Sequence, residues 1–380
     1  MAELNDPEAE PGREATKITT TVTDLVDLRR RLTGWLAAKT GGPVEVGEVT
    51  RPDGNGLSSI SLLFDAAWRE DGHAVRAGLV ARLPPDATSY PVFPRYDLRR
   101  QYDVISAVAA HTDVPVPRLR WIEESPDALG VPFIVMDRID GGRVPVDNPP
   151  YVFGGWIMDA GPARQRELQD GAIRALAGVH TLSNPGEHLP NLAAEAGDDP
   201  LRALVEEQRY YYEWALAGDG IRIPIIEEAF GWLEAHWPDE PGETVLCWGD
   251  ARPGNIIYDG FRPIAVLDWE MCALGPREVD LGWMIFLHRF FQDIAEMFEA
   301  PGIPGMFRPD DAAATYAEAS GHSVTNLDFY LMFAALRHAI VMARIKRRSI
   351  HFGEDTVPPT PDEYVLFHRQ LRRMLDGGAP

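Results

Sequence analysis

The sequence predicts an α+β protein with two lobes, a small antiparallel β-sheet in the N-terminal lobe and a mostly helical C-terminal lobe. Strand-like runs joined by turn signals are concentrated before residue 139, whereas helical periodicity of apolar residues dominates after it. A chain of 380 residues is also long enough for two separate cores. We therefore expect a flexible acidic tail at 1–18, an N-terminal lobe at 19–139 and a C-terminal lobe at 140–380.

Composition and charge restrict the classes of partner. Hydrophobic content of 45% and charged content of 25% are ordinary for a soluble globular protein. A formal net charge of -22 argues against nucleic acid or an anionic membrane as the main partner. It favours cationic small molecules, although solubility alone also explains an acidic surface. Because no signal-peptide pattern opens the chain, we expect Cys247 and Cys272 to be free thiols in a cytoplasmic protein. The oligomeric state is not predicted.

The N-terminal lobe begins with a helix and continues with strands. Apolar residues from Leu25 to Leu36 fall on one helical face, with Thr21 or Thr23 as the expected N-cap. Three strand-like runs follow, and the turn at Asp71-Gly72 joins the last two into a hairpin. The expected strands are 44–50, 58–68 and 74–83.

A helix at about 96–110 and two further strands complete this lobe. The strands are expected at Leu119–Glu123 and Phe133–Met136. The run 136–142 contains two glycines and resembles a linker between two lobes, with an ordinary loop as the alternative.

Four apolar periodic segments predict helices in the C-terminal lobe. The last of them is the most apolar, but Arg337, His338 and Arg344 interrupt it, which favours a buried helix over a membrane span. We expect His180 to be a packed, hydrogen-bonded core histidine. The tyrosine stripe at 210–212 is expected to form core and groove wall. The expected helices are 164–182, 201–216, 225–237 and 329–345.

The stretch 245–270 carries the polar groups with the clearest chemical pattern. Asp250 follows a strand-like run, Asn255 opens another, and Asp268 ends a third. A hairpin with its turn at Asp259-Gly260 would place Asn255 and Asp268 side by side. Carboxylate and amide oxygens suit Mg²⁺, and Asp250 could serve as base for a hydroxyl nucleophile. The simpler interpretation is a hairpin whose carboxylates only cap turns.

Trp248-Gly249-Asp250…Asn255…Asp268 resembles the catalytic loop of the aminoglycoside phosphotransferase family of small-molecule kinases, which has His at the position of Trp248. The resemblance implies a bilobal protein-kinase-like fold. It also implies transfer of the γ-phosphoryl group of ATP, with GTP as the alternative donor, to a hydroxyl of a small molecule. In that arrangement Asp250 is the base, and Asn255 and Asp268 hold Mg²⁺.

The same resemblance implies a nucleotide site in the N-terminal lobe. Arg82 stands where the family has a phosphate-binding Lys, and Gln101 stands where it has the Glu that pairs with that Lys. Asp97 is a candidate replacement for the Glu, and a solvated strand-end charge is the alternative for Arg82. The linker residue Met136 would pair with the base through its backbone. The loop expected to cover the phosphates contains Asn55, Gly56, Ser58 and Ser59.

Asp280 precedes an apolar helical run and is expected to cap it and, by the resemblance, to steady the backbone of the catalytic loop. We treat it as structural.

Three alternatives to a small-molecule kinase stay open. The departures at Trp248, Arg82 and Gln101 would also suit a nucleotide-binding pseudoenzyme. A protein kinase is disfavoured because only six residues separate Asp268 from Gly275, too few for an activation loop. A plain interaction module would bind no nucleotide.

The acceptor is not identified by the sequence. No dense acidic cluster stands next to the site, and the aromatic run 149–156 with the tyrosine stripe predicts a partly apolar acceptor pocket.

Overall fold

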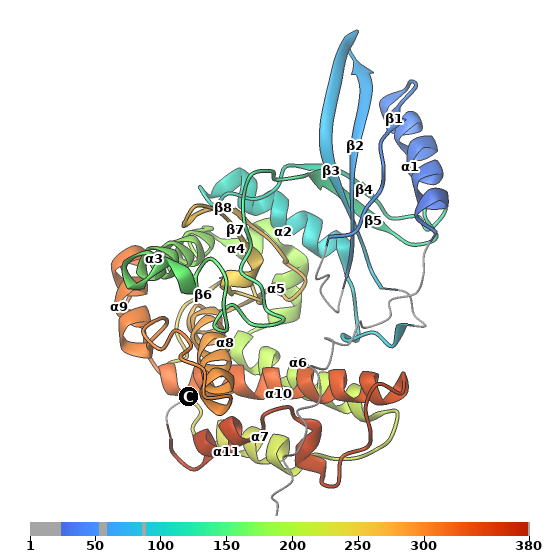
Figure 1. Ribbon diagram of the computed structural model, residues 1–380. Helices are drawn as coiled ribbons and strands as arrows, with labels where there is room; N and C mark the ends of the chain where they lie inside the picture. The colour runs from blue at the N-terminus through green and yellow to red at the C-terminus, as the bar shows by residue number, and fades with distance from the viewer. Residues whose placement is uncertain (1–23, 53–58, 86–88, 379–380) are drawn as a thin grey trace, which may run out of the picture.

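The computed structural model describes residues 24–52, 59–85 and 89–378. It has the predicted α+β architecture, in which a five-stranded sheet with two helices precedes a mostly helical lobe (Figure 1). The expected tail at 1–18 lies outside the described residues. So do Asn55, Gly56 and Ser58 of the expected phosphate-covering loop.

The sheet of the N-terminal lobe is antiparallel throughout, with strand order β1-β2-β3-β5-β4. The β2–β3 hairpin turns at Asp71 and Gly72 with φ of 48° and 81°, as their sequence predicted. The first strand is shorter than expected, because after two residues only an isolated bridge between Thr50 and Leu63 continues the pairing. The strands are β1 Glu45–Val46, β2 Ile60–Glu70, β3 His73–Leu83, β4 Leu119–Glu123 and β5 Phe133–Asp137.

Helix α1 (Leu25–Thr40) covers the sheet with its apolar face, and Leu32 and Leu36 are fully buried there. Its N-cap is Asp24, whose side chain accepts hydrogen bonds from two backbone N–H groups of the first turn. The prediction of Thr21 or Thr23 as cap was therefore wrong, because an Asp nearer the helix satisfies these donors.

The segment between β3 and α2 (Leu98–His111) leaves the sheet and lies on the helical lobe. We call its described part, residues 89–97, the connector. The Tyr211 hydroxyl donates to the carbonyl of Val92 at 2.8 Å, and the Arg344 Nε donates to that of Pro91 at 2.9 Å. The connector therefore ties the strand that carries Arg82 to the helices of the second lobe.

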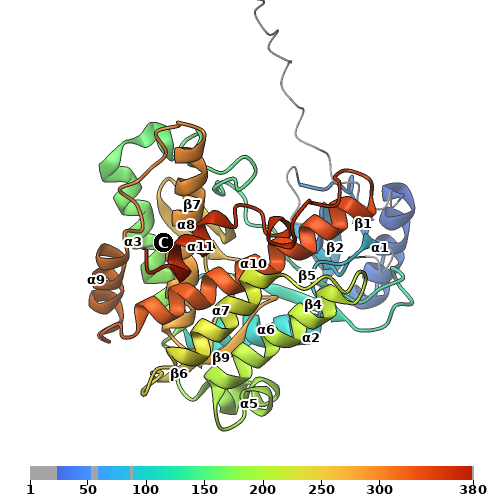
Figure 2. The ribbon, with the colours of Figure 1, turned by 90° about the horizontal axis from the view of Figure 1, so that it is seen from below.

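The predicted helices of the C-terminal lobe are all present. The central one is α10, which contacts α6, α7 and α8, and α6, α7 and α10 are seen side by side in Figure 2. Within the described residues no helix is long and apolar enough to cross a membrane. The helices are α3 Pro162–Val179, α4 Pro185–His188, α5 Pro190–Ala196, α6 Pro200–Leu216, α7 Pro224–Ala235, α8 Glu278–Met297, α9 Pro309–Ser320, α10 Leu327–His351 and α11 Arg369–Leu375.

Two antiparallel ribbons lie within the helical lobe and carry the polar residues of the 245–270 stretch. They are β6 (Thr244–Cys247) with β9 (Ala273–Pro276), and β7 (Ile256–Asp259) with β8 (Arg262–Val266). Their residues belong to the large core of this lobe, which is separate from the core under the N-terminal sheet.

Gly282 allows the close approach of α8 to α10, since an added Cβ would lie 2.9 Å from the backbone oxygen of Tyr330. Gly282→Ala is therefore expected to lower the free energy of unfolding by about 1–3 kcal/mol through overpacking. Gly231→Ala is the matched control, because Gly231 lies in α7 with nothing near its missing Cβ and should gain about 0.5–1 kcal/mol. Equal midpoints of chemical denaturation for the two variants would contradict this account of the packing.

Candidate active site

The candidate catalytic loop begins after Cys247, where β6 ends. Its second residue, Gly249, cannot be replaced by another residue without distortion of the backbone. Gly249 has φ of 93°, and a Cβ at this position would lie 2.0 Å from the carbonyl oxygen of Met271. The chain can therefore turn tightly against the neighbouring segment only with Gly at this position. This turn directs Asp250 away from the strand.

Asp280, on α8, fixes the backbone of the candidate catalytic loop. Its carboxylate accepts the backbone N–H of Trp248 at 2.6 Å and that of Gly249 at 2.8 Å, and it contacts the His180 Nε2 at 3.1 Å. His180 is buried and also bonds the Tyr316 hydroxyl, as expected for a packed histidine. Asp280 lies inside the first turn of α8, beyond the N-cap residue, so its predicted capping role was wrong. Its support of the loop backbone is confirmed.

Three donors from two segments fix the Asp250 carboxylate. Trp283 Nε1 donates to Oδ1 at 2.8 Å, while Arg252 Nε and Asn255 Nδ2 donate to Oδ2 at 2.9 and 2.7 Å. Burial alone would raise the pKa of Asp250. The charge of Arg252 and these hydrogen bonds outweigh burial and hold the pKa below its usual value, so the group is a carboxylate at neutral pH.

The β7–β8 hairpin brings the two candidate metal ligands to the same end of the ribbon. Its turn lies at Gly260 and Phe261, one residue later than the predicted Asp259-Gly260 pair, because Asp259 still pairs with Arg262. The N–H of Leu267 donates to the carbonyl of Asn255 at 2.9 Å. Asp268, the next residue, has φ of 61°, a conformation that is uncommon outside glycine and clusters at functional sites.

Trp248, the main departure from the family pattern, supports this hairpin. Its side chain is fully buried, and Nε1 donates to the carbonyls of Leu267 at 2.8 Å and Asp268 at 3.1 Å. The indole therefore supplies a ring N–H donor and fills the space under the loop. These contacts identify Trp248 as a structural support of the loop and the hairpin.

The donor set at this end of the hairpin fits Mg²⁺. Asn255 uses its Nδ2 on Asp250, and its Oδ1 has no hydrogen-bond partner among the described residues. With the Asp268 carboxylate this gives two hard oxygen groups and leaves positions for phosphate oxygens. The described part of the chain contains no cluster of three or more His, Cys, Asp or Glu able to hold a metal by itself.

Arg82, at the end of β3, faces this site from the other lobe. Its guanidinium bonds Asp268 at 2.6 Å and Glu270 at 3.2 Å, and Ser59 Oγ donates to Glu270 at 2.9 Å. Burial opposes the charge on Arg82, but the two carboxylates outweigh it and raise its pKa. Because only 14% of the side chain is exposed, a solvated strand-end charge does not describe Arg82.

The partner of Arg82 was predicted incorrectly. Asp97 caps α2 by accepting the backbone N–H of Arg100, and it makes no contact with Arg82. Gln101 is buried on α2, and its Nε2 has no partner among the described residues. Glu270 supplies the carboxylate that α2 lacks.

Met136 lies in β5, opposite Val80 of β3 and Leu119 of β4, and is mostly buried at the edge of the N-terminal lobe. Met136 therefore lies next to the linker between the lobes, as expected from its position in the sequence.

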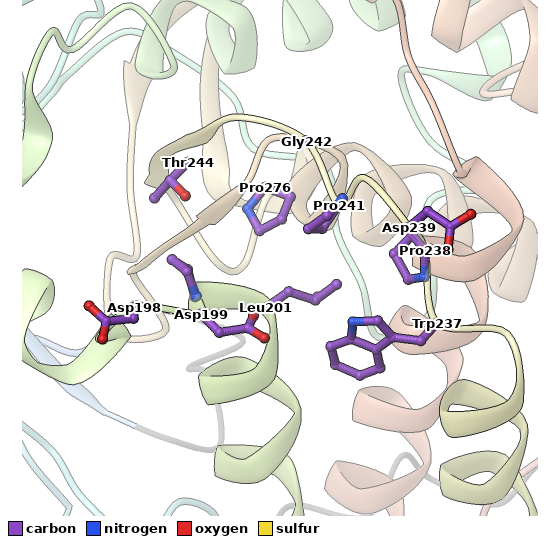
Figure 3. A pocket seen from close by; sticks show the side chains of 11 residues that line it. Asp198, Asp199, Leu201, Trp237, Pro238, Asp239, Pro241, Gly242, Thr244 and Pro276 are labelled. Carbon is purple, nitrogen blue, oxygen red and sulfur yellow. The ribbon is translucent and has the colours of Figure 1, made fainter.

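Some of the aromatic residues considered for the acceptor pocket belong to the core, whereas Tyr210 is 55% exposed. Tyr212 is fully buried, and Tyr151 is buried with its hydroxyl on His288. A cavity of about 570 Å³ lies where Thr244 and Pro276 pair at the far end of the β6–β9 ribbon from Asp250 (Figure 3). It does not adjoin the candidate active site.

Sequence reasoning did not identify Trp283, Arg252 and Glu270 as parts of the site. Arg252 and Glu270 lie two positions after Asp250 and Asp268, so proximity along the chain was an available signal. Trp283 comes from α8, and only the packing of α8 against the loop reveals it.

The fold and this constellation define a kinase-like small-molecule phosphotransferase architecture. Comparison with protein families agrees, since residues 61–313 match the model of the phosphotransferase enzyme family known as APH. The chain belongs to this family.

Solved structures share the fold over almost the whole chain. A Ralstonia eutropha protein assigned as an aminoglycoside phosphotransferase aligns with a TM-score of 0.62 and 21% identity, covering 91% of this chain and 96% of that one. The macrolide 2'-phosphotransferase MphH of Brachybacterium faecium gives 0.53 and 19%, covering 92% and 99%. The aminoglycoside phosphotransferase APH(4)-Ia, in a ternary complex with ADP and hygromycin B, gives 0.51 and 14%, covering 92% and 99%.

Curated relatives include much longer proteins. IBR3 of Arabidopsis thaliana, named a probable acyl-CoA dehydrogenase, is 24% identical over 78% of this chain and 36% of its own length. The human acyl-CoA dehydrogenase family member 11 is 26% identical over 68% of this chain and 32% of its own. The chain thus spans about a third of these relatives.

Asp280→Asn should lower the free energy of unfolding by about 1–3 kcal/mol, because an amide N–H would face a buried backbone donor of Trp248 or Gly249. Thermal or chemical denaturation measures this loss. Glu318→Gln, an exposed change on α9, is the control and should leave stability within about 0.5 kcal/mol. If both variants melt like the parent, the Asp280 carboxylate does not support the loop.

Proposed function

We propose that this protein is an ATP-dependent phosphotransferase that moves the γ-phosphoryl group to a hydroxyl of a small molecule. The observation that carries the proposal is the Asp250 carboxylate, held ionised by Trp283, Arg252 and Asn255. It lies beside the hairpin that ends in Asp268. Relatives of the same fold solved with ADP or AMP-PNP support ATP as the donor.

Asp250 orients the acceptor hydroxyl and takes its proton as the new O–P bond forms. Its three hydrogen bonds keep both oxygens in place, so little reorganisation is needed when the acceptor arrives. The lowered pKa favours orientation over strong basicity, which suits a reaction whose transition state asks for little proton abstraction.

Asn255 and Asp268 would hold Mg²⁺, which supplies charge neutralisation for the phosphate oxygens. Asp268 can pair with this cation instead of with Arg82. Arg82 then keeps Glu270 as its partner and presents its remaining N–H groups to phosphate. Ser59 bonds the same Glu270, so the one described residue of the phosphate-covering loop adjoins this contact.

A protein kinase is disfavoured by the same geometry. Only a short loop lies between Asp268 and Ala273, where β9 begins to pair with β6. This leaves no room for an activation segment at that point. The acceptor is therefore expected to be a small molecule.

Asp268→Asn tests the metal assignment, because Asn tolerates the positive φ of this position and removes only the charge. Loss of a charged contact worth about 1.5–3 kcal/mol corresponds to an affinity for Mg-ATP about 10- to 100-fold weaker. Titration calorimetry measures this affinity. Asp259→Asn, at the exposed turn of the same hairpin, is the control. Unchanged Mg-ATP affinity in Asp268→Asn would remove Asp268 from the site.

Asp250→Asn tests the role of the carboxylate on the acceptor. With an acceptor found by following ADP release across a panel of hydroxyl compounds, kcat should fall by about 10²–10⁴ while ATP affinity stays close to the parent value. Wild-type kcat in this variant would exclude Asp250 as the base. Tight Mg-ATP binding with no acceptor turned over would instead identify a nucleotide-binding pseudoenzyme.

A further inference from the structure

One face of α10 carries three arginines that the proposed reaction does not use. Arg337, Arg344 and Arg348 are spaced by seven and four residues and therefore share a face. Each is at most 7% exposed. We call these three residues the α10 arginine face.

None of the three makes an ion pair with a carboxylate of the described residues, although their neighbours on α10 do. Lys346 pairs with Asp355, and Arg347 pairs with Asp219 at 2.8 Å. Burying a guanidinium without a close counter-charge costs several kcal/mol in general. Three buried guanidinium groups without a paired carboxylate would be stabilised by an anionic group from outside the helix.

Arg337 links this face to the catalytic loop. Its guanidinium carbon lies 4.6 Å from the ring centroid of Trp283, the residue that donates to Asp250, and its Nη2 donates to the carbonyl of Gly249 at 3.2 Å. The Nε and Nη1 groups are buried and have no hydrogen-bond partner among the described residues. Asp250, Asp280 and Glu207 act on its charge only from a distance.

Arg344 and Arg348 continue the face under the connector. The Arg344 guanidinium carbon lies 3.7 Å from the Tyr90 ring centroid and 4.1 Å from that of Trp214. Each arginine gives only its Nε to a connector carbonyl, so the terminal Nη groups stay available. The carboxylate that acts on Arg348 is Glu354, again from a distance.

Two tyrosines connect Arg344 with the nucleotide side of the site. Burial raises the pKa of Tyr211 and Tyr96, and on both of them the charges of Arg344 and Glu270 act with opposite signs. Tyr211 packs against Trp214, with the ring centroids 6.0 Å apart, and Trp214 in turn lies against the guanidinium of Arg344. The arginine face therefore contacts the catalytic loop through Arg337 and the connector through Arg344 and Arg348.

We propose that the α10 arginine face binds an anionic group, a carboxylate or a phosphate, of the hydroxyl acceptor. This inference rests on the proposed phosphotransferase function and names the acceptor class. Arg337 and Arg348 are eleven positions apart, which corresponds to about 17 Å along a helix. An elongated acceptor can therefore place its hydroxyl at Asp250 and its anionic group at Arg344 or Arg348. In a chain with net charge -22, this face supplies the local positive field that such a compound needs.

The first experiment measures ADP release from Mg-ATP with matched acceptors, namely hydroxycarboxylates against their methyl esters and sugar phosphates against the free sugars. Turnover should be confined to the anionic members, and the two series separate carboxylate from phosphate. Arg344→Gln should raise KM for the active acceptor about 10- to 100-fold with KM for ATP unchanged. Equal turnover of the neutral members overturns the proposal.

Two further variants separate charge from packing. Arg344→Lys keeps the cation and loses the planar stack with Tyr90 and Trp214, so it should recover part of the acceptor affinity. Lys346→Gln removes one positive charge from the same helix and should match the parent protein, since Lys346 is already paired. A KM effect of the same size in Lys346→Gln would mean that net charge alone is responsible.

The second experiment needs no acceptor. With saturating Mg-ADP, inorganic phosphate should raise the Tm of the parent protein and of Lys346→Gln, and this shift should disappear in Arg344→Gln. No phosphate-dependent shift, or the same shift in all three proteins, overturns the arginine proposal. Failure of the phosphotransferase proposal is distinguishable, because it would abolish ADP release with every acceptor while leaving the phosphate-dependent Tm shift in place.

Discussion

The acceptance of two backbone N–H groups by the Asp280 carboxylate is the interaction on which the site depends. Trp248 and Gly249 are buried, so their backbone N–H groups cannot form hydrogen bonds with solvent water and need an acceptor within the protein. Once these donors are satisfied, the turn at Gly249 is fixed and Asp250 meets Trp283 and Arg252. The geometry of the Asp250 carboxylate is therefore set, through the backbone of the loop, by Asp280 of α8.

The lobes, most elements and the polar residues of the two ribbons were predictable because their signals are local. Apolar periodicity revealed α1 and α10, and the Asp71-Gly72 and Asp259-Gly260 pairs revealed both hairpins. The N-cap of α1 was missed because Asp24 competes with two threonines that are equally good by type. Predictions that rested on loop residues 55, 56 and 58 lie outside the described part of the chain.

Long-range partners were less accessible to sequence reasoning. The bond between Arg82 and Glu270 joins residues 188 positions apart, so no local pattern predicts it. The sign of the net charge of the whole chain also differs from the sign of the buried charges on α10. A net charge of -22 favours cationic ligands, whereas Arg337, Arg344 and Arg348 on α10 are buried and form no ion pair with a carboxylate of the described residues. Global charge averages over surfaces that a bound molecule never meets.

The position of Glu270 has a consequence for regulation. In protein kinases the phosphate-binding cation is paired with a helix of the small lobe, so displacing that helix breaks the pair and turns the enzyme off. Here α2 contributes no carboxylate to Arg82, whose partners Asp268 and Glu270 both follow β8 in the large lobe. Rotation of α2 would therefore break no ion pair of Arg82. Arg82 and its two carboxylates come from different lobes, so any increase in the distance between the lobes at this point would separate them.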